Sequence, residues 1–273
     1  MLRVVNIPIK SPIRLGNFVF IMANVLSKIE NSIGLIDSEK LKVQFLTKRL
    51  NLVNDLKIIG FNDIFLNKLY SNIDNFTINY DLQHQNFGVG FHLDVMNYLC
   101  GLISNSSQFN SQKSLLEKLY SIDENDVAVH IRCGDYLTLR KIYCFFDRNV
   151  FFEWAFSQLS EIKNINRIFL FSDDFKYCNN HYLKTLSEFS NQIIPVNFAE
   201  HDYQDMLMMG VFKNIILLNS TFSCVSAYIS DVINSGRSNI YAPKYFVNYD
   251  VKYKPCNSEW NLFENEFSNN VFL

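Results

Sequence analysis

The chain has 273 residues, of which 48% are hydrophobic, and a formal net charge of −2 at pH 7. This length and apolar content allow one large globular domain or two of ordinary size. The near-neutral charge argues against a nucleic acid as partner, because binding to a phosphate backbone requires a clustered basic surface. The six cysteines contain no Cys-x-x-Cys pair, and the first residues lack the pattern of a secretory signal, so we expect reduced thiols in a cytoplasmic protein.

Short runs rich in Val, Ile and Phe predict buried strands. In chain order they cover residues 2–7, 127–131, 167–171, 192–196, 214–218 and 239–242. Between these runs, helical spacing of apolar residues predicts helices at residues 17–30, 148–162, 176–187, 203–212 and 222–234. Each helix is long enough to connect two parallel strands, so the sequence predicts an α/β fold.

Polar, turn-forming residues accumulate at positions 104–112. They predict a boundary near residues 105–125, and we expect two domains that cover residues 1–115 and 116–273. Residues 40–50 mix basic and apolar side chains. This mixture indicates either an amphipathic helix packed on a sheet, which we favour, or a membrane-surface helix, which would give the protein a peripheral association with a membrane.

The predicted strand at residues 127–131 leads directly into a polar cluster, which consists of His130, Arg132, Gly134 and Asp135. In parallel sheets, ligands bind beyond the carboxyl ends of the strands. The guanidinium of Arg132 is always charged, and its planar fork of donors suits a phosphate. The structural alternative is that Arg132 and Asp135 form an ion pair with each other near the strand end.

Two further strand ends carry polar side chains. Asp173 and Asp174 follow the strand at 167–171, where they could accept hydrogen bonds from a ribose or base, hold a divalent metal, or cap the next helix. The third strand end combines a strand terminus with a helix start, and its polar residues are Asn219, Ser220, Thr221 and Ser223. Hydroxyls and main-chain N–H groups at a helix start suit a phosphate, and the chain has no Gly-x-Gly-x-x-Gly or Walker A motif to hold one.

Near the N-terminus, the sequence Arg-Leu-Gly-Asn occupies residues 14–17. Gly16 allows a tight passage from the first strand into a helix that begins near Asn17. Asn17 either caps that helix or reaches into the ligand-binding cleft expected beyond the carboxyl ends of the strands. The alternative is an ordinary turn between a strand and a helix.

These motifs together resemble those of the α-1,2-fucosyltransferases, glycosyltransferase family 11. The similar segments are His130-Ile-Arg132 with Gly134-Asp135-Tyr136, Phe171-Ser-Asp-Asp174, Asp205-Met-Leu-Met-Met209, Asn219-Ser-Thr-Phe-Ser223 and Ala227-Tyr228. They follow the family order over residues 127–243, and residues 15–17 with Phe20 and Ala23 look like a degraded version of the family's opening motif. The chain is therefore similar to a divergent bacterial member of this family.

The resemblance implies a GT-B-like fold, with two Rossmann-like domains that face each other across a cleft. The N-terminal domain would lie on the acceptor side, and the C-terminal domain would hold the nucleotide-sugar donor. The implied reaction transfers L-fucose from GDP-β-L-fucose to the 2-hydroxyl of a galactose-type acceptor, with inversion and without a required metal or other cofactor. Bacterial members commonly build surface polysaccharides, which implies an oligosaccharide or lipid-linked glycan acceptor, at the inner face of the membrane in the latter case.

The resemblance also assigns roles to residues. Arg132 matches the arginine that neutralises the pyrophosphate as GDP leaves, and His130 matches the motif histidine that touches the nucleotide. Asp173 and Asp174 would lie near the guanosine. The donor-binding set is completed by Asn17, Asn219, Ser220, Thr221 and Ser223.

The base that accepts the proton of the attacking hydroxyl is less well defined. Asp135 is the leading candidate. Asp37, or a mechanism without a strong base, are the alternatives. In addition, Cys133 occupies the place where the family usually has a second arginine, which removes one expected phosphate contact.

Three other functions remain open on sequence grounds. The first is a transferase with a different nucleotide-sugar donor. The second is a metal-dependent transferase or phosphohydrolase with its metal at Asp173 and Asp174. The third is a protein that binds a nucleotide sugar without turnover.

Overall fold

The computed structural model describes residues 3–8, 15–33, 41–46, 55–61, 75–77, 93–138, 143–144, 146–197, 199–247 and 255–265. The first part of the chain contains β1 (Arg3–Pro8), α1 (Leu15–Ile33), β2 (Leu41–Leu46), the π-helical turn η1 (Lys57–Phe61), β3 (Asn75–Thr77), α3 (Leu93–Ser104) and α4 (Ser107–Tyr120). The second part contains β4 (Val127–Ile131), the 3₁₀ turn η3 (Gly134–Leu137), α5 (Arg148–Ser160), β5 (Ile168–Ser172), α6 (Phe175–His181), α7 (Leu183–Ser187), β6 (Ile193–Pro195), α8 (Asp202–Met209), β7 (Asn214–Leu217), α9 (Thr221–Ile233), β8 (Asn239–Pro243) and β9 (Asn261–Phe263).

The strands form two parallel sheets, which confirms the predicted α/β class and the pair of sheets expected of a GT-B-like chain. The first sheet has the order β2-β1-β3, and the second has the order β6-β5-β4-β7-β8-β9. In the second sheet the chain moves outward from β4 through β5 to β6, and then returns to the other side of β4 as β7. The connections after β4 and β7 therefore lead away from each other. In parallel sheets, a reversal of this kind is where the ligand-binding crevice forms, and we use the word crevice for the region beyond the carboxyl ends of β4 and β7.

Alternating side chains of the larger sheet face two separate hydrophobic clusters. On one face, Val127, Val129 and Ile131 pack with α5, α6 and α7. On the other face, Ala128 lies in a cluster that includes buried residues of α8 and α9. Burial on both faces explains why the central strands are continuous apolar runs in the sequence.

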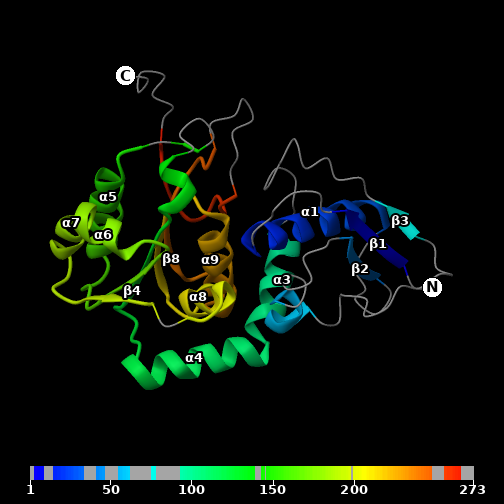
Figure 1. The fold of residues 1–273 in the computed structure, drawn as a ribbon, viewed down its shortest axis with the longest axis horizontal. Coiled ribbons are helices and arrows are strands. Elements are labelled where there is room, and N and C mark those ends of the chain that lie inside the picture. Colours follow the sequence, from blue (N-terminus) through cyan, green and yellow to red (C-terminus); the bar gives the residue numbers. More distant parts are fainter. Residues whose placement is uncertain are drawn as a thin grey trace.

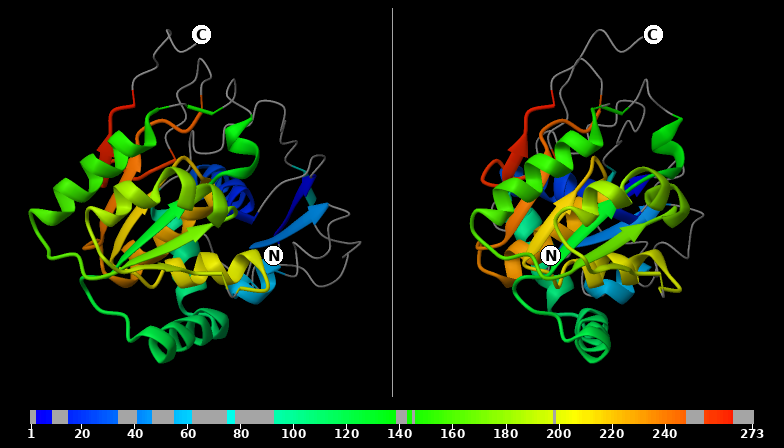
Figure 2. Two further views of the ribbon diagram at one scale, coloured as in Figure 1. Left: turned by 60° about the vertical axis from the view of Figure 1, so that its left-hand side comes forward. Right: turned by 90° about the vertical axis from the view of Figure 1, so that its left-hand side faces the viewer.

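Helices α1 and α3 pack against α9, so they lie between the smaller sheet and the larger one (Figure 1). The views in Figure 2 show the same arrangement of the two sheets from the side. A single hydrophobic cluster contains Phe18 of α1, Leu99 of α3 and Tyr228 of α9. The core thus continues across the predicted division of the chain at residue 115. Among the described residues, no helix combines the length and apolar character needed to cross a membrane.

The interpretation of residues 40–50 was wrong. The segment at 40–50 was interpreted as an amphipathic helix, but Leu41–Leu46 form β2, which pairs in parallel with β1. Apolar Leu41, Val43 and Phe45 alternate with Lys42 and Gln44, and this period of two favours a strand. Because residues 41–46 form a strand, they are not the membrane-surface helix that was the alternative.

The polar stretch at 104–112, interpreted as turn-rich, is mostly the first half of α4. The Ser106 side chain caps this helix by accepting a hydrogen bond from the main-chain N–H of Phe109 at 3.1 Å. Serine is a strong N-cap residue, so the same composition that suggested a loop in fact starts a helix. Similarly, the helix predicted at 176–187 is divided into α6 and α7 at Tyr182.

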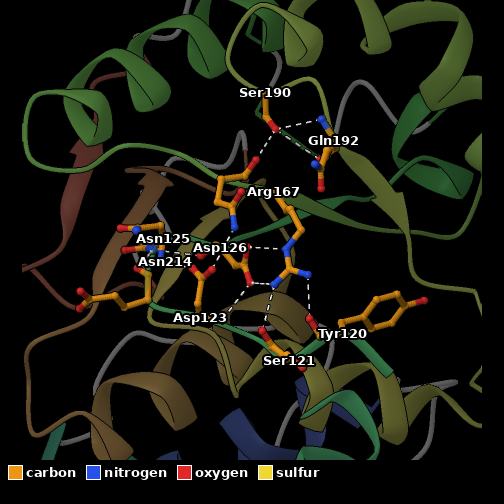
Figure 3. A network of polar contacts seen from close by, with 11 residues as sticks. Tyr120, Ser121, Asp123, Asn125, Asp126, Arg167, Ser190, Gln192 and Asn214 are labelled. Atoms are coloured by element: carbon orange, nitrogen blue, oxygen red, sulfur yellow. Dashed lines mark hydrogen bonds and ion pairs between the residues drawn. The ribbon is translucent and has the colours of Figure 1, made fainter. Parts of the chain in front are cut away.

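The amino ends of β4 and β5 are joined by a network of polar contacts around Arg167 and Asp126 (Figure 3). Nε and Nη2 of Arg167 donate to the two carboxylate oxygens of Asp126 at 2.9 and 2.5 Å. Nη1 and Nη2 of Arg167 also donate to the main-chain carbonyls of Tyr120 and Ser121 at the end of α4. This network lies at the edge of the sheet opposite the crevice, and we assign it a structural role.

Candidate functional site

The residues that follow β4 and β7, which were predicted to act together, lie next to each other at the crevice. β4 and β7 are paired directly, with His130 opposite Leu217. The chain leaves β4 through Arg132 into η3, and it leaves β7 through Asn219 into α9. Two of the three predicted strand ends therefore flank the reversal of strand order, where α/β sheets bind their ligands. The third, after β5, is adjacent to β4.

Arg132 is held by Asp173, which follows β5. Nη1 of Arg132 lies 2.8 Å from Oδ2 of Asp173, and the two side chains are 21% and 25% exposed. The other carboxylate oxygen of Asp173 accepts the main-chain N–H of Cys133 at 2.7 Å. Arg132 therefore has an ion-pair partner in Asp173, and the predicted pair with Asp135 stays a prediction, because the Asp135 side chain lies outside the described part of the structure. The pair with Asp173 fixes the guanidinium at the edge of the crevice.

Gly134 makes this arrangement possible. Its φ is +27°, and a Cβ at this position would lie 2.6 Å from Oδ2 of Asp173. Only glycine avoids both the unfavourable backbone conformation and the clash. The glycine of the motif therefore serves the Arg132–Asp173 pair.

Cys133 lies in the core, whereas the neighbouring Arg132 is partly exposed. The side chain of Cys133 is fully buried, with Sγ 3.9 Å from the thiol of Cys178 and 3.9 Å from the hydroxyl of Ser172. The contact with Cys178 and the burial raise the pKa of the Cys133 thiol, so it stays uncharged. Position 133 therefore contributes to the core under the strand end and places no side chain in the crevice.

Asp174 caps α6, which was the structural alternative for this residue. Its Oδ1 accepts the main-chain N–H of Tyr177 at 2.8 Å. With both oxygens of Asp173 also engaged by protein donors, the two adjacent carboxylates are committed to internal contacts. Within the described ranges, no group of three or more His, Cys, Asp or Glu side chains is placed to hold a metal ion.

Some of the predicted site residues at the start of α9 are bonded within the protein, and others lie at the open end of the helix. Asn219 and Ser223 are buried and bond to the protein itself. Nδ2 of Asn219 donates to the main-chain carbonyls of Cys144 and Phe246, and the hydroxyl of Ser223 donates to the main-chain carbonyl of Ser220. Ser220 occupies the N-cap position, but its side chain makes no capping hydrogen bond. A 13-residue helix without a side-chain cap presents main-chain N–H donors at its start, which favours an anion there.

The side chain of Asn17 reaches across to α9, and its predicted contact with the donor stays a prediction. Oδ1 of Asn17 accepts a hydrogen bond from Oγ1 of Thr221 at 2.5 Å. Because α1 begins at Leu15, Asn17 lies inside the first turn and is not the cap. The interpretation of Gly16 as a turn residue was wrong, since Gly16 is helical and lies against the backbone of α9.

Replacing Gly16 with alanine is expected to lower the melting temperature and to separate α1 from α9. The added Cβ would lie 2.5 Å from the main-chain nitrogen of Phe222 and 2.7 Å from the carbonyl carbon of Thr221. Backbone atoms cannot move aside as a flexible side chain can, so we expect a loss of about 3 kcal/mol in the free energy of unfolding, the upper part of the overpacking range. Gly101→Ala in α3 is the control, because its Cβ would meet nothing within 4 Å. Equal stability of the two variants in thermal unfolding would contradict this account.

His130 lies under the crevice and is 5% exposed. Its ring lies 5.6 Å from that of Phe222, and its Nδ1 has no hydrogen-bond partner in the described part of the chain. The pKa of His130 is lowered to about 4, mainly by burial, while the charge of Asp173 acts to raise it and the charge of Arg148 acts to lower it. His130 is therefore neutral at pH 7, and a neutral ring can offer or accept one hydrogen bond without adding charge.

The free energy of unfolding is expected to fall as the pH decreases from 6.5 to about 4. In this window the unfolded chain takes up a proton on His130 that the folded chain does not, so the stability present above pH 6.5 is lost on acidification. The full contribution is about 3 kcal/mol. Denaturant unfolding of the His130→Gln variant over the same range should show a flatter pH dependence. Parallel curves for the variant and the original protein would contradict the assignment.

A pocket beside the crevice contains residues that sequence reasoning missed. It is lined by Tyr136, Tyr143, Cys144, Phe146, Arg148 and Asn219. The rings of Tyr136 and Tyr143 are stacked, with centroids 3.6 Å apart. One signal could have identified Arg148, because a cation in the first turn of a helix is electrostatically unfavourable and often serves another purpose.

Some predicted residues cannot be placed. The backbone of Asp135 lies in η3 directly beyond Arg132, but its side chain is outside the described part of the structure. Asp37 and residue 14 also lie outside the described residues. The position of the catalytic base therefore stays a prediction.

Comparison with known proteins supports the motif analysis. The model of the family described as glycosyl transferase family 11 matches residues 103–262, which is more than half of the chain. The O-antigen biosynthesis glycosyltransferase WbnK of Escherichia coli is 30% identical over 123 residues, which cover 42% of this chain and 38% of that relative.

Two solved structures align with most of the chain at low identity. A glycosyl transferase family 9 protein from Veillonella parvula has a TM-score of 0.48 and 9% identity, and the match covers 97% of this chain and 87% of that one. The ADP-heptose LPS heptosyltransferase II of E. coli has a TM-score of 0.45 and 11% identity, with 96% and 90% covered.

Proposed function

Because this chain belongs to glycosyltransferase family 11, we propose that it transfers L-fucose from GDP-β-L-fucose to the 2-hydroxyl of a galactose-type acceptor during surface glycan synthesis. The observation that carries the proposal is the crevice between β4 and β7, which joins a fixed guanidinium to an uncapped helix start. Both features favour a diphosphate. The similarity to an O-antigen glycosyltransferase supports a glycan acceptor.

In the proposed reaction, the acceptor oxygen attacks the anomeric carbon of fucose while the bond from that carbon to the GDP oxygen breaks. The donor electron pair leaves with GDP, and Arg132 with the start of α9 stabilises the charge that develops on the diphosphate. The proton of the acceptor hydroxyl passes to a base, for which Asp135 is our candidate because it follows Arg132 at the crevice. Attack opposite the leaving group inverts the anomeric centre.

The neutral ring of His130 and the contact between Asn17 and Thr221 have supporting roles in this proposal. His130 lies beneath the donor and offers a nitrogen without adding positive charge to the leaving group. The Asn17–Thr221 hydrogen bond joins the first turn of α1 to that of α9, so the N-terminal part of the chain reaches the donor site. Asp173 acts through Arg132, which it positions.

The proposal is tested by a donor and acceptor screen with mass-spectrometric detection. GDP-fucose and other nucleotide sugars are offered with lactose, lacto-N-biose and N-acetyllactosamine, with and without chelator. We expect a mass gain of one fucose from GDP-fucose alone, unchanged by chelator because no cofactor is required. Transfer from another donor would overturn the fucosyl assignment, and activity that is lost with chelator and restored by Mn²⁺ or Mg²⁺ would overturn the metal-independent mechanism.

A further inference from the structure

The crevice contains less positive charge than a diphosphate requires. The guanidinium of Arg132 is already paired with Asp173 at 2.8 Å, and position 133 directs an uncharged thiol into the core. A nucleoside diphosphate brings at least two negative charges to the site, and unpaired charge in a partly buried site is costly. A second cation near the crevice would therefore strengthen binding of the donor.

Arg148 is placed to supply this charge. It is the first residue of α5 and is partly buried, and its Nη1 donates to the hydroxyl of Tyr182 at 3.3 Å. In the described part of the chain, no carboxylate lies within 4.0 Å of its guanidinium nitrogens. The preceding residue, Asp147, uses its carboxylate to cap α5 by accepting the N–H groups of Asn149 and Val150.

Three observations connect Arg148 to the crevice. It lines the same pocket as Asn219, which lies between β7 and α9, and as Tyr136, which lies in the turn beyond Arg132. Its charge also acts on His130 under the crevice. In addition, a side-chain cation at a helix start opposes the helix dipole, so the position is unfavourable unless an anion offsets it.

We propose that Arg148 is a donor-binding residue that contacts the diphosphate of the nucleotide sugar, and so provides the second positive charge that position 133 does not. Arg148 is partly buried and lines this pocket together with the stacked rings of Tyr136 and Tyr143. A less hydrated environment strengthens the attraction between the guanidinium and phosphate oxygens. This inference rests on the proposed function, since it assigns a residue to the same donor site.

The test is isothermal titration calorimetry with GDP, pyrophosphate and guanosine. For Arg148→Ala we expect affinity for GDP and pyrophosphate to fall by about 10- to 100-fold, the range of a charge-assisted hydrogen bond, with guanosine affinity unchanged. Arg148→Lys should recover part of the loss because it keeps the charge. Arg148→Met preserves the aliphatic stem and should behave like the alanine variant, which guards against a loss caused by poor folding. Arg237→Ala, at an exposed position, is the matched control.

The outcomes separate the inference from the function on which it rests. Normal pyrophosphate affinity in Arg148→Ala or Arg148→Met would overturn the role of Arg148 and leave the proposed function intact. An equal loss of guanosine and GDP affinity would also overturn it, because a phosphate contact cannot weaken a ligand that has no phosphate. If the original protein binds neither GDP nor pyrophosphate, the proposed function itself fails.

Discussion

Replacing Arg132 with alanine is expected to lower kcat/KM for fucosyl transfer by about 10²- to 10³-fold, the usual effect of removing one group that stabilises developing charge. The guanidinium is fixed by Asp173 before the donor binds, so its position does not have to be established during the reaction. Lysine at this position keeps the charge but loses the planar fork of donors, and we expect an intermediate rate. Steady-state kinetics with GDP-fucose measure both effects.

The control for this series is Arg237→Ala, which removes an exposed arginine from the turn that follows α9. Its kcat/KM should equal that of the original protein. Melting temperatures of all variants establish that they are folded. Full activity in a folded Arg132→Ala variant would remove Arg132 from the mechanism.

Replacing Arg167 with alanine should destabilise the protein by about 4 kcal/mol, within the range found when one partner of a buried ion pair is removed. Asp126 has no exposed surface, so the change leaves a buried carboxylate without its cation. The same change frees the carbonyls of Tyr120 and Ser121 at the end of α4. Urea unfolding monitored by circular dichroism measures the difference in the free energy of unfolding.

Lys163→Ala provides the comparison for Arg167→Ala at the same end of the sheet. Lys163 pairs with Glu124 at 3.3 Å, and the Glu124 side chain is 71% exposed. Such a surface pair contributes about 1 kcal/mol or less. If both variants lose the same stability, burial of Asp126 is not the cause of the effect.

The sequence predicted the parallel sheet around β4 well because its strands are buried on both faces and read as continuous apolar runs. β9 was missed because three residues at the sheet edge, partly exposed, do not produce such a run. β2 was mistaken for a helix because its basic residues suggested a surface, although the alternation of apolar residues indicated a strand. At β2 the amino-acid composition suggested the wrong element, whereas the spacing of the apolar residues indicated the right one.

The sequence predicted part of the candidate site, because the order of parallel strands indicates which strand ends lie side by side. The parallel arrangement of strands made it possible to infer that residues after β4 and β7 would meet. The partner of Arg132 could not be inferred, because Asp173 lies about 40 positions later and its carboxylate had several plausible uses. The inward direction of Cys133 and the pocket position of Arg148 likewise depend on packing that only the folded chain defines.

Hydrogen–deuterium exchange with and without GDP tests most directly whether the crevice between β4 and β7 is the donor site. The account predicts that GDP slows exchange at residues 132–137 and 219–223, which follow the two strands, and leaves α4 and α7 unchanged. Protection confined to other segments, or no protection at a GDP concentration that saturates binding, would contradict the account.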